Sequence, residues 1–231
     1  GKKLSTAKLT IKTGIGWMHP LIQSGFEYAM ENKNGISFEV APQLNVINKN
    51  KRGIGIGLDM FLSNSGVIVT DIWGEEGKNI IKWGSVLTYE VTEELHNASR
   101  NIKNNLAIGI SSGYVHPVFE IFLKSGFVNQ KIEESDRIGI TKYEMYGNNA
   151  IDSTIRESTE IENSNYKRKK FYVGFGFDIF PFIKSDNDFG KGFSLNSEIL
   201  LVAGSPVHLS GYIFEPGQNI FKLGLNYTFR K

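Results

Sequence analysis

Apolar and polar residues alternate along most of the chain, in segments of about ten residues. From Phe221 to Phe229, apolar or aromatic residues take every odd position, and polar or small residues take every even one. The same division recurs in residues 53–62 and 171–179. Side chains of a β-strand point alternately to two faces, so each segment predicts a strand with one apolar face. Turn-forming residues separate the segments and no long stretch has a helical period, which predicts an all-β chain.

Three sequence blocks occur twice, in the same order. Residues 9–20 (LTIKTGIGWMHP) match 106–117 (LAIGISSGYVHP), 55–61 (GIGLDMF) match 174–180 (GFGFDIF), and 79–84 (NIIKWG) match 219–224 (NIFKLG). Chance does not preserve such an order, so the blocks predict an internal duplication. We expect one β-barrel domain over residues 1–231, with pseudo-repeats at 1–100 and 101–231.

Each copy is expected to supply six strands. In the first copy they lie near residues 8–18, 25–31, 36–46, 53–62, 67–73 and 80–91. In the second they lie near residues 106–115, 119–128, 138–146, 171–183, 207–214 and 219–229. The plan predicts an up-and-down antiparallel transmembrane β-barrel of about 12 strands with both termini on the periplasmic side. The apolar stretch 193–202 fits this plan poorly, so the expected range is about 10–14 strands.

The polar faces of these strands are rich in glycine, as at Gly53, Gly55 and Gly57. Repeated glycine on one face indicates a tightly curved sheet or a crowded interior, as in a small closed barrel. A soluble β-sandwich also alternates and is the alternative, although its outer face normally carries larger polar residues. Aromatic residues near the ends of the apolar faces favour a membrane interface: Trp17, Trp83, Tyr89, Tyr114, Tyr227 and Phe229.

Composition narrows the class of protein further. No run of about 18 apolar residues occurs, so no transmembrane helix is expected. The absence of cysteine excludes disulfides and thiolate metal sites, and a net charge of +2 without a basic stripe gives no reason to expect nucleic-acid binding. The first residues, Gly1-Lys2-Lys3, precede no apolar segment. With the strand pattern, this predicts a cleaved signal peptide and a place in the bacterial outer membrane of a Gram-negative-type envelope.

The segment Phe221–Phe229 (FKLGLNYTF) resembles the terminal strand of bacterial outer-membrane β-barrel proteins, which closes on an aromatic-x-Phe end. In that class the barrel assembly machinery recognises this end. The resemblance therefore implies that Tyr227 and Phe229 are an assembly signal, and that this machinery and membrane lipid are partners. The class usually stops at the phenylalanine, whereas Arg230 and Lys231 follow it here.

If the apolar faces meet lipid, the polar faces line the lumen. The expected lumen-lining residues carry both signs of charge: Lys12, Glu27, Glu39, Asp59, Lys82, Glu90, Asp178 and Lys222. In a barrel of about 8–10 strands such charges would pair across a filled interior, whereas with about 12 or more they would line an aqueous path. A stabilising salt-bridge network and a selectivity filter are both open as hypotheses.

Catalytic residues are few. His19 and His116 occupy equivalent His-Pro positions, followed by Ser24 and Ser125, and some outer-membrane hydrolases use a Ser-His pair. A His-Pro step at a strand end is also an ordinary turn, and duplication explains why it occurs twice. No metal-ligand cluster or phosphate-binding loop stands out. We therefore expect no enzyme, catalytic residue, metal or cofactor, with a lipid-modifying Ser/His hydrolase as the third-ranked function.

Residues 148–170 are polar, charged and too long for a turn, which predicts a surface loop able to bind an external ligand. The leading function predicted from the sequence is a porin-like channel or transport barrel that passes small solutes through a polar lumen. The alternative is a closed structural or adhesive barrel that binds external partners through its loops.

Overall fold

The computed structural model describes residues 6–21, 29–82, 88–146, 149–150, 155–180, 192–204, 207–209, 212–214 and 217–230. All regular structure in these ranges is β-strand, which confirms the all-β prediction. Among the described residues, no helix is long and apolar enough to cross a membrane.

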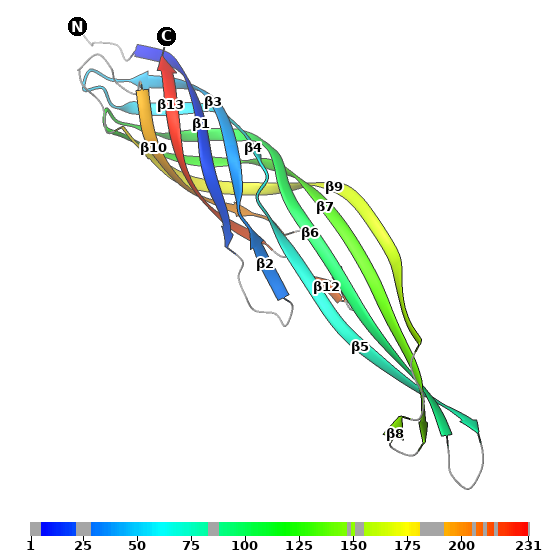
Figure 1. Cartoon of the computed structure of the whole chain (residues 1–231). Coiled ribbons are helices and arrows are strands. Elements are labelled where there is room, and N and C mark those ends of the chain that lie inside the picture. The colour runs from blue at the N-terminus through cyan, green and yellow to red at the C-terminus, as the bar shows by residue number, and fades with distance from the viewer. Residues whose placement is uncertain are drawn as a thin grey trace.

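Eight antiparallel strands close into a ring, in which each strand pairs with the next along the chain and the last pairs with the first (Figure 1). They are β1 (Thr6–Leu21), β3 (Gly35–Ile47), β4 (Gly53–Ser63), β6 (Thr88–Val115), β7 (Phe119–Tyr146), β9 (Ile155–Ile179), β10 (Gly192–Val202) and β13 (Gln218–Arg230). The ring is an up-and-down barrel, and its two terminal strands close it side by side. Thr10 pairs with Arg230, so both ends of the described chain lie at the same end of the ring.

The ring has eight strands, fewer than the 10–14 expected from the sequence. In the prediction, long strands were divided into two, because their polar middle parts resemble the connections between strands. Residues 106–115 are the end of β6, and the expected strands at 119–128 and 138–146 are both parts of β7. The stretch 193–202, which fitted the plan poorly, forms the ring strand β10.

Several strands continue far beyond the ring, on the side away from the termini (Figure 1). β6 and β7 have 28 residues each, β9 has 25, and β5 (Gly66–Lys82) has 17. A membrane crossing needs only about 9–11 residues in a strand. We call the sheet formed outside the ring by β5 and the long parts of β6, β7 and β9 the extension.

Short strands complete the fold. β2 (Ala29–Lys33) pairs with the start of β5, and β8 (Asn149–Ala150) pairs with the end of β7. β11 (Val207–Leu209) and β12 (Tyr212–Phe214) form a separate two-stranded hairpin. The expected strands at 25–31 and 67–73 overlap β2 and β5, which are not part of the ring.

A change of partner marks the boundary between ring and extension. β6 pairs with β4 through Leu106–Val115 and with β5 through Thr88–Lys103, and the backbone N–H of Asn104 bonds to the carbonyl of Ser65 at the junction (2.8 Å). The pairing of β6 with β7 shifts register between Asn104 and Ala107. Such a bulge bends a strand, so it allows one strand to serve both a closed ring and an open sheet.

The expected surface loop at residues 148–170 is wrong for most of its length. Residues 155–170 belong to β9, and Lys142 to Val128 of β7 pair with Ile155 to Lys170 across the sheet. The segment lacks an apolar face because this part of β9 extends into water. It stays a strand because its backbone pairs with that of β7. Polarity therefore indicated exposure correctly but not the absence of a strand.

The duplication stays a prediction. The first pair of matched blocks ends at Pro20, the residue before the end of β1, and at Pro117, two residues after the end of β6. β1 and β6 are separated in the ring by β3 and β4, so they run in opposite directions. The two His-Pro steps thus lie at opposite ends of the ring.

Candidate functional site

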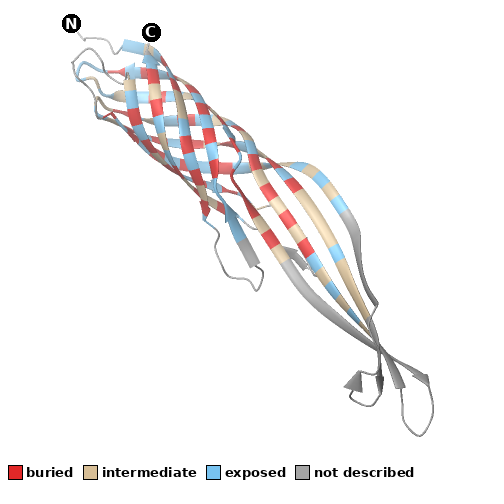
Figure 2. Cartoon of the chain, viewed as in Figure 1, coloured by how far each residue is buried: buried red, intermediate tan, exposed pale blue. Residues whose placement is uncertain are grey.

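The outside of the ring is apolar. On every ring strand most outward residues are large and hydrophobic, and they alternate with inward residues that are mostly buried (Figure 2). Representative members, one or two from each strand, are Ile15, Phe38, Ile56, Ile110, Leu123, Phe127, Phe171, Phe175, Leu195 and Leu225, all at least 45% exposed. So much exposed apolar surface is unstable in water and fits the hydrocarbon of a bilayer. We call these outward residues the lipid-facing belt.

The inside of the ring holds charged side chains in direct contact. Lys124 of β7 places its Nζ 2.8 Å from Glu39, 2.8 Å from Asp59 and 3.1 Å from Glu198. Lys222 of β13 also contacts Glu39, and lies 3.0 Å from Glu198. These side chains come from strands all round the ring, and none is more than 3% exposed. They cross-link opposite walls.

A second group of charges continues this network. Lys12 of β1 lies 3.0 Å from Glu120 and also contacts Asp178. The ring of Phe122 separates the two groups, with Lys12 Nζ 4.9 Å and Lys124 Nζ 5.0 Å from its centroid. Each ammonium therefore combines carboxylate contacts with a cation–π contact. The eight charged residues of both groups form what we call the interior network: Lys12, Glu39, Asp59, Glu120, Lys124, Asp178, Glu198 and Lys222.

Glycines make room for these side chains. A Cβ on Gly176 would lie 2.6 Å from Glu198 and 2.7 Å from Phe122. A Cβ on Gly14 would lie 1.8 Å from Asn226. The glycine-rich polar face seen in the sequence thus corresponds to a crowded interior.

An apolar layer fills the ring between the interior network and the extension. It contains Met18, Phe61, Ala107, Val128, Tyr172, Leu200, Val202 and Ile220, none more than 6% exposed. We call it the apolar plug. The hydroxyl of Tyr172 donates to Asp59 (2.8 Å), which joins the plug to the network. The interior of the ring is therefore filled by side chains at two successive levels.

A closed antiparallel ring with an even number of strands, a polar interior and an apolar exterior satisfies every backbone group within a bilayer. The chain is an outer-membrane β-barrel. Bacterial outer membranes are where barrels of this build are found, and their termini lie on the periplasmic side. The extension consequently lies on the outer side of the membrane.

Comparison with known proteins gives the following likenesses. No protein-family model and no curated protein matches the sequence. The barrel is similar to the solved structure of Ail, the attachment invasion locus protein of Yersinia pestis, with 8% identity, a TM-score of 0.37, and 98% of this chain and 100% of that chain covered. It is similar to the N-terminal β-barrel domain of Pseudomonas aeruginosa OprF, with 9% identity, a TM-score of 0.32, and 97% and 100% covered. Neisserial surface protein A matches with 7% identity and a TM-score of 0.32 over 97% and 99% of the two chains.

Five expected lumen residues lie inside the barrel, in the interior network: Lys12, Glu39, Asp59, Asp178 and Lys222. Lys82 and Glu90 instead lie on the extension, where β5 and β6 pair with each other far from the ring. They are not lumen residues. The sequence suggested that they were, because the period-two pattern continues along strands that have left the barrel. Glu27 lies outside the described residues.

Three members of the network were not predicted from the sequence: Glu120, Lys124 and Glu198. Glu120 and Lys124 alternate with the outward Ile121 and Leu123, so the signal was present in the residues 119–128. Glu198 was missed because the strand that carries it did not fit the twelve-strand plan.

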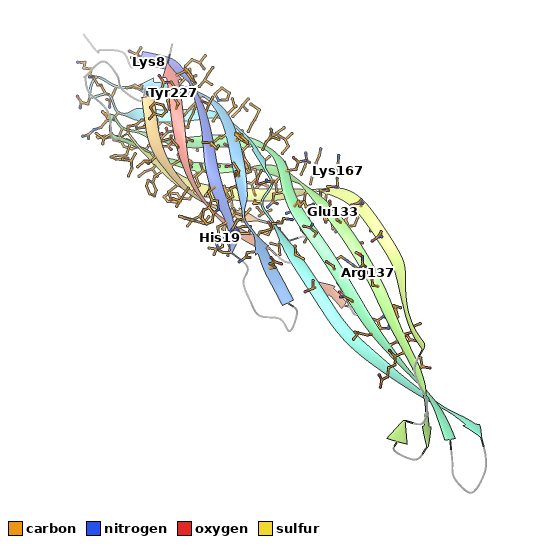
Figure 3. The ribbon with its side chains drawn as sticks, viewed as in Figure 1. Lys8, His19, Glu133, Arg137, Lys167 and Tyr227 are labelled. Atoms are coloured by element: carbon orange, nitrogen blue, oxygen red, sulfur yellow. The ribbon has the colours of Figure 1, made fainter. Side chains whose placement is uncertain are left out.

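Tyr227 and Phe229 lie on β13, at the seam where it pairs with β1. Their rings contact each other edge to face, with centroids 4.6 Å apart, and Phe229 is 53% exposed. Figure 3 shows Tyr227 near the end of the barrel that carries the termini. Recognition of these residues by the assembly machinery stays a prediction. Of the other expected interface aromatics, Trp17 and Tyr114 are exposed on the barrel, Tyr89 lies on the extension instead, and Trp83 lies outside the described residues.

The expected histidine and serine residues are not brought together. His116 forms the turn before β7, where its Nδ1 accepts from the backbone N–H of Val118 (3.3 Å). Ser125 pairs with Ile110, five positions along β7 from the Val115–Glu120 pair, which corresponds to about 17 Å. His19 lies near the opposite end of the barrel (Figure 3), and Ser24 is outside the described residues. In the part of the chain that the structure describes, no three His, Asp or Glu side chains are arranged to hold a metal ion.

The extension has two different faces. On one face, Arg100 bonds to Asp136 (3.0 Å from Nη2) and pairs with Glu134 (3.2 Å), which accepts from the hydroxyl of Tyr166 (2.7 Å). Partial burial and this hydrogen bond raise the pKa of Tyr166 to about 12. On the other face, Glu133 accepts from two lysines, and these bonds lower its pKa to about 2.

Proposed function

We propose that the chain is a closed anchoring barrel that holds the extension outside the outer membrane as a binding surface for an external partner. The filled interior carries this proposal. Every charge of the interior network is paired and at most 7% exposed on its side chain, and the apolar plug adds a dry layer across the same lumen. A solute path would require both levels to move apart.

The length of the strands supports the second half of the proposal. Between Thr88 and Lys103, β6 is paired on both sides outside the ring, and β7 is paired likewise. These strands continue well past the length that a bilayer requires. A rigid sheet positions side chains better than a mobile loop does, which suits recognition of a partner.

The edge of the extension offers a second means of contact. β10 pairs with β9 only through Tyr172–Ile179, so within the described residues the same edge of β9 has no neighbouring strand from Ile155 to Lys170. An extended segment of a partner can add to such an edge through backbone hydrogen bonds. The proposed contact thus involves part of the segment 148–170, for which ligand binding was predicted from the sequence, as a strand edge and not as a loop.

A shortened chain tests the proposal. Residues 72–97 and 138–159 are each replaced by an Asn-Gly turn, which joins the cross-strand partners Asp71 with Ala98 and Arg137 with Glu160 and so keeps the register. Bacteria that display the full or the shortened chain are compared for attachment to immobilised heparin, collagen and mucin. We expect attachment by the full chain only, with both chains heat-modifiable on gels.

Planar bilayer recordings test the closed lumen. We expect no conductance steps from the full chain. Steps of defined size would favour the channel that the sequence first suggested.

In the attachment test, equal attachment by the full and the shortened chain would contradict a binding role of the extension. Attachment of the full chain to none of the three surfaces would contradict it as well.

A further inference from the structure

Four lysines lie together on the outer face of the extension, next to the lipid-facing belt. Lys103 of β6 is the cross-strand partner of Lys131 in β7, and Lys131 is the cross-strand partner of Lys167 in β9. Lys169 follows on β9, two residues from the belt residue Phe171. We call these four residues the lysine row.

The lysine row faces the same side as the belt. Lys167 and Lys169 share odd positions with Phe171, which is 48% exposed. Lys131 shares them with Phe127, which is 58% exposed. Because side chains alternate along a strand, all of these lysines project outward and not over the lumen. Along β9, Lys169 lies about 7 Å and Lys167 about 13 Å beyond the belt. We infer that lipid headgroups begin at this level, because the exposed apolar residues that fit the hydrocarbon end at Phe171 on this strand.

The charge of the row is only partly neutralised within the described chain. Glu133 accepts hydrogen bonds from Lys103 (2.7 Å) and from Lys131 (2.8 Å). Among the side chains that the structure describes, none forms an ion pair with Lys167 or Lys169. One carboxylate does not balance four lysines, and like charges opposite each other in a sheet repel, so a further anion beside the row would stabilise it.

We propose that the lysine row binds the phosphate groups of the outer-leaflet glycolipid, of the lipid A type, that surrounds the barrel. The apolar chains of such a lipid lie against the belt, and its phosphates lie just beyond them, where Lys169 and Lys167 are placed. Lysine stems cover apolar surface while their ammonium groups reach the headgroup level. The inference depends on the orientation of the barrel in the membrane and not on partner binding by the extension.

Native mass spectrometry of the full chain, refolded in detergent and titrated with purified bis-phosphorylated lipid A, tests the proposal. Each lysine near an anionic surface strengthens binding about fivefold. Lys169→Glu should therefore weaken lipid A binding at least about fivefold, and Lys167→Glu/Lys169→Glu about 25-fold. Arg137→Glu is the matched control, because it makes the same change of charge as Lys169→Glu on an exposed residue of β7. Arg137 lies six residues beyond Lys131 in β7, which corresponds to about 20 Å along a strand. Figure 3 shows Arg137 farther along the extension than Glu133 and Lys167. Lipid A binding by Arg137→Glu should therefore change less than about twofold.

A variant with the opposite sign keeps the test independent of folding defects. Glu133→Gln removes the carboxylate from the row without adding a charge, and should strengthen lipid A binding. Lipid A without phosphates should bind equally weakly to the wild-type chain and to Lys169→Glu. All variants are first checked for heat-modifiability.

Three results would overturn the proposal. The first is equal binding of lipid A by the wild-type chain and Lys169→Glu. The second is equal binding of phosphorylated and dephosphorylated lipid. The third is that soluble heparin binding falls in Lys169→Glu while lipid A binding does not, which would assign the row to a sulfated polysaccharide. The first two results leave attachment by the tip of the extension untouched, whereas the third would assign attachment to heparin to the lysine row, which the shortened chain keeps.

Discussion

Tyr172 and Asp59 join the two levels that fill the barrel: the tyrosine hydroxyl of β9 donates to a carboxylate oxygen of β4, 2.8 Å away and across the lumen. The tyrosine ring lies in the apolar plug, edge to face with Phe61 at 5.8 Å, whereas the aspartate belongs to the interior network and also contacts Lys124. A single side chain thus fixes the plug above the charges. Both partners are fully buried.

Tyr172→Phe should lower the free energy of unfolding by about 1.5–3 kcal/mol, because it removes a hydrogen bond to a charged group and leaves the ring in place. Urea unfolding of the barrel in lipid vesicles measures the change. Tyr114→Phe is the control, since Tyr114 is 41% exposed on the outside and should change stability by less than about 0.5 kcal/mol. An equal loss in both variants would show that the bond to Asp59 contributes nothing.

Lys124→Met should destabilise the barrel by about 3–5 kcal/mol, because Glu39, Asp59 and Glu198 would lose a shared cation inside a dry lumen. The same unfolding assay applies. Lys49→Met is the control, because Lys49 is an exposed residue of the turn between β3 and β4. Adding Asp59→Asn to Lys124→Met should restore part of the stability, because Lys222 still pairs with Glu39 and Glu198 whereas Asp59 contacts Lys124 as its cation. If the double variant is the less stable one, the network does not act through this cation.

Two glycines of β7 should respond differently to alanine. A Cβ on Gly126 would lie 2.3 Å from the carbonyl oxygen of Ile108 and 2.4 Å from Gly109, both in the backbone of β6. Gly126→Ala should therefore cost about 1–3 kcal/mol and slow refolding into vesicles. On Gly139 the nearest atom is 3.8 Å away, so Gly139→Ala should be neutral or slightly stabilising. Similar behaviour of both variants would mean that the close contact of β6 and β7 at Gly126 is not required.

The extension should loosen at high pH. The pKa of Tyr166 is raised to about 12 in the folded chain, above its usual value near 10. The proton is thus held more tightly in the folded state, and its contribution is complete below about pH 10 and lost as the pH rises towards about 12. Tyrosine absorbance at 295 nm, recorded for the wild-type chain and Tyr166→Phe, should differ by one group that titrates near this upper value. Titration of that group near pH 10 would show that Glu134 does not hold its proton.

The sequence predicted the wall of the barrel better than its size. Outward and inward faces follow directly from alternation, and the rule placed Lys12, Glu39 and Asp178 inside the lumen. Strand number failed because alternation measures how long the chain stays extended, not where a bilayer ends. Neither the change of partner at Ser65 nor the bulge at Asn104 has a hydrophobic signature, so one strand was counted as two.

The plug and the lysine row escaped sequence analysis for a different reason. Met18, Phe61 and Tyr172 are apolar residues on the face that alternation assigns to the lumen, and only a closed ring shows that they meet. Lys103, Lys131 and Lys167 are far apart in sequence, and it is the register between β6, β7 and β9 that places them in one row. Contacts between strands depend on register, which a single sequence does not display.

The unbroken passage of β6, β7 and β9 from the bilayer into water has a mechanical consequence. A load applied at the tip of the extension and directed away from the cell runs along these strands, parallel to their axes. The hydrogen bonds between β6 and β7, continuous from Thr88 to Val115 apart from one bulge, then share the load in shear and do not open one after another. A bacterium held by this sheet would pull on a tether whose far end is already embedded in its own membrane, with no hinge between grip and anchor.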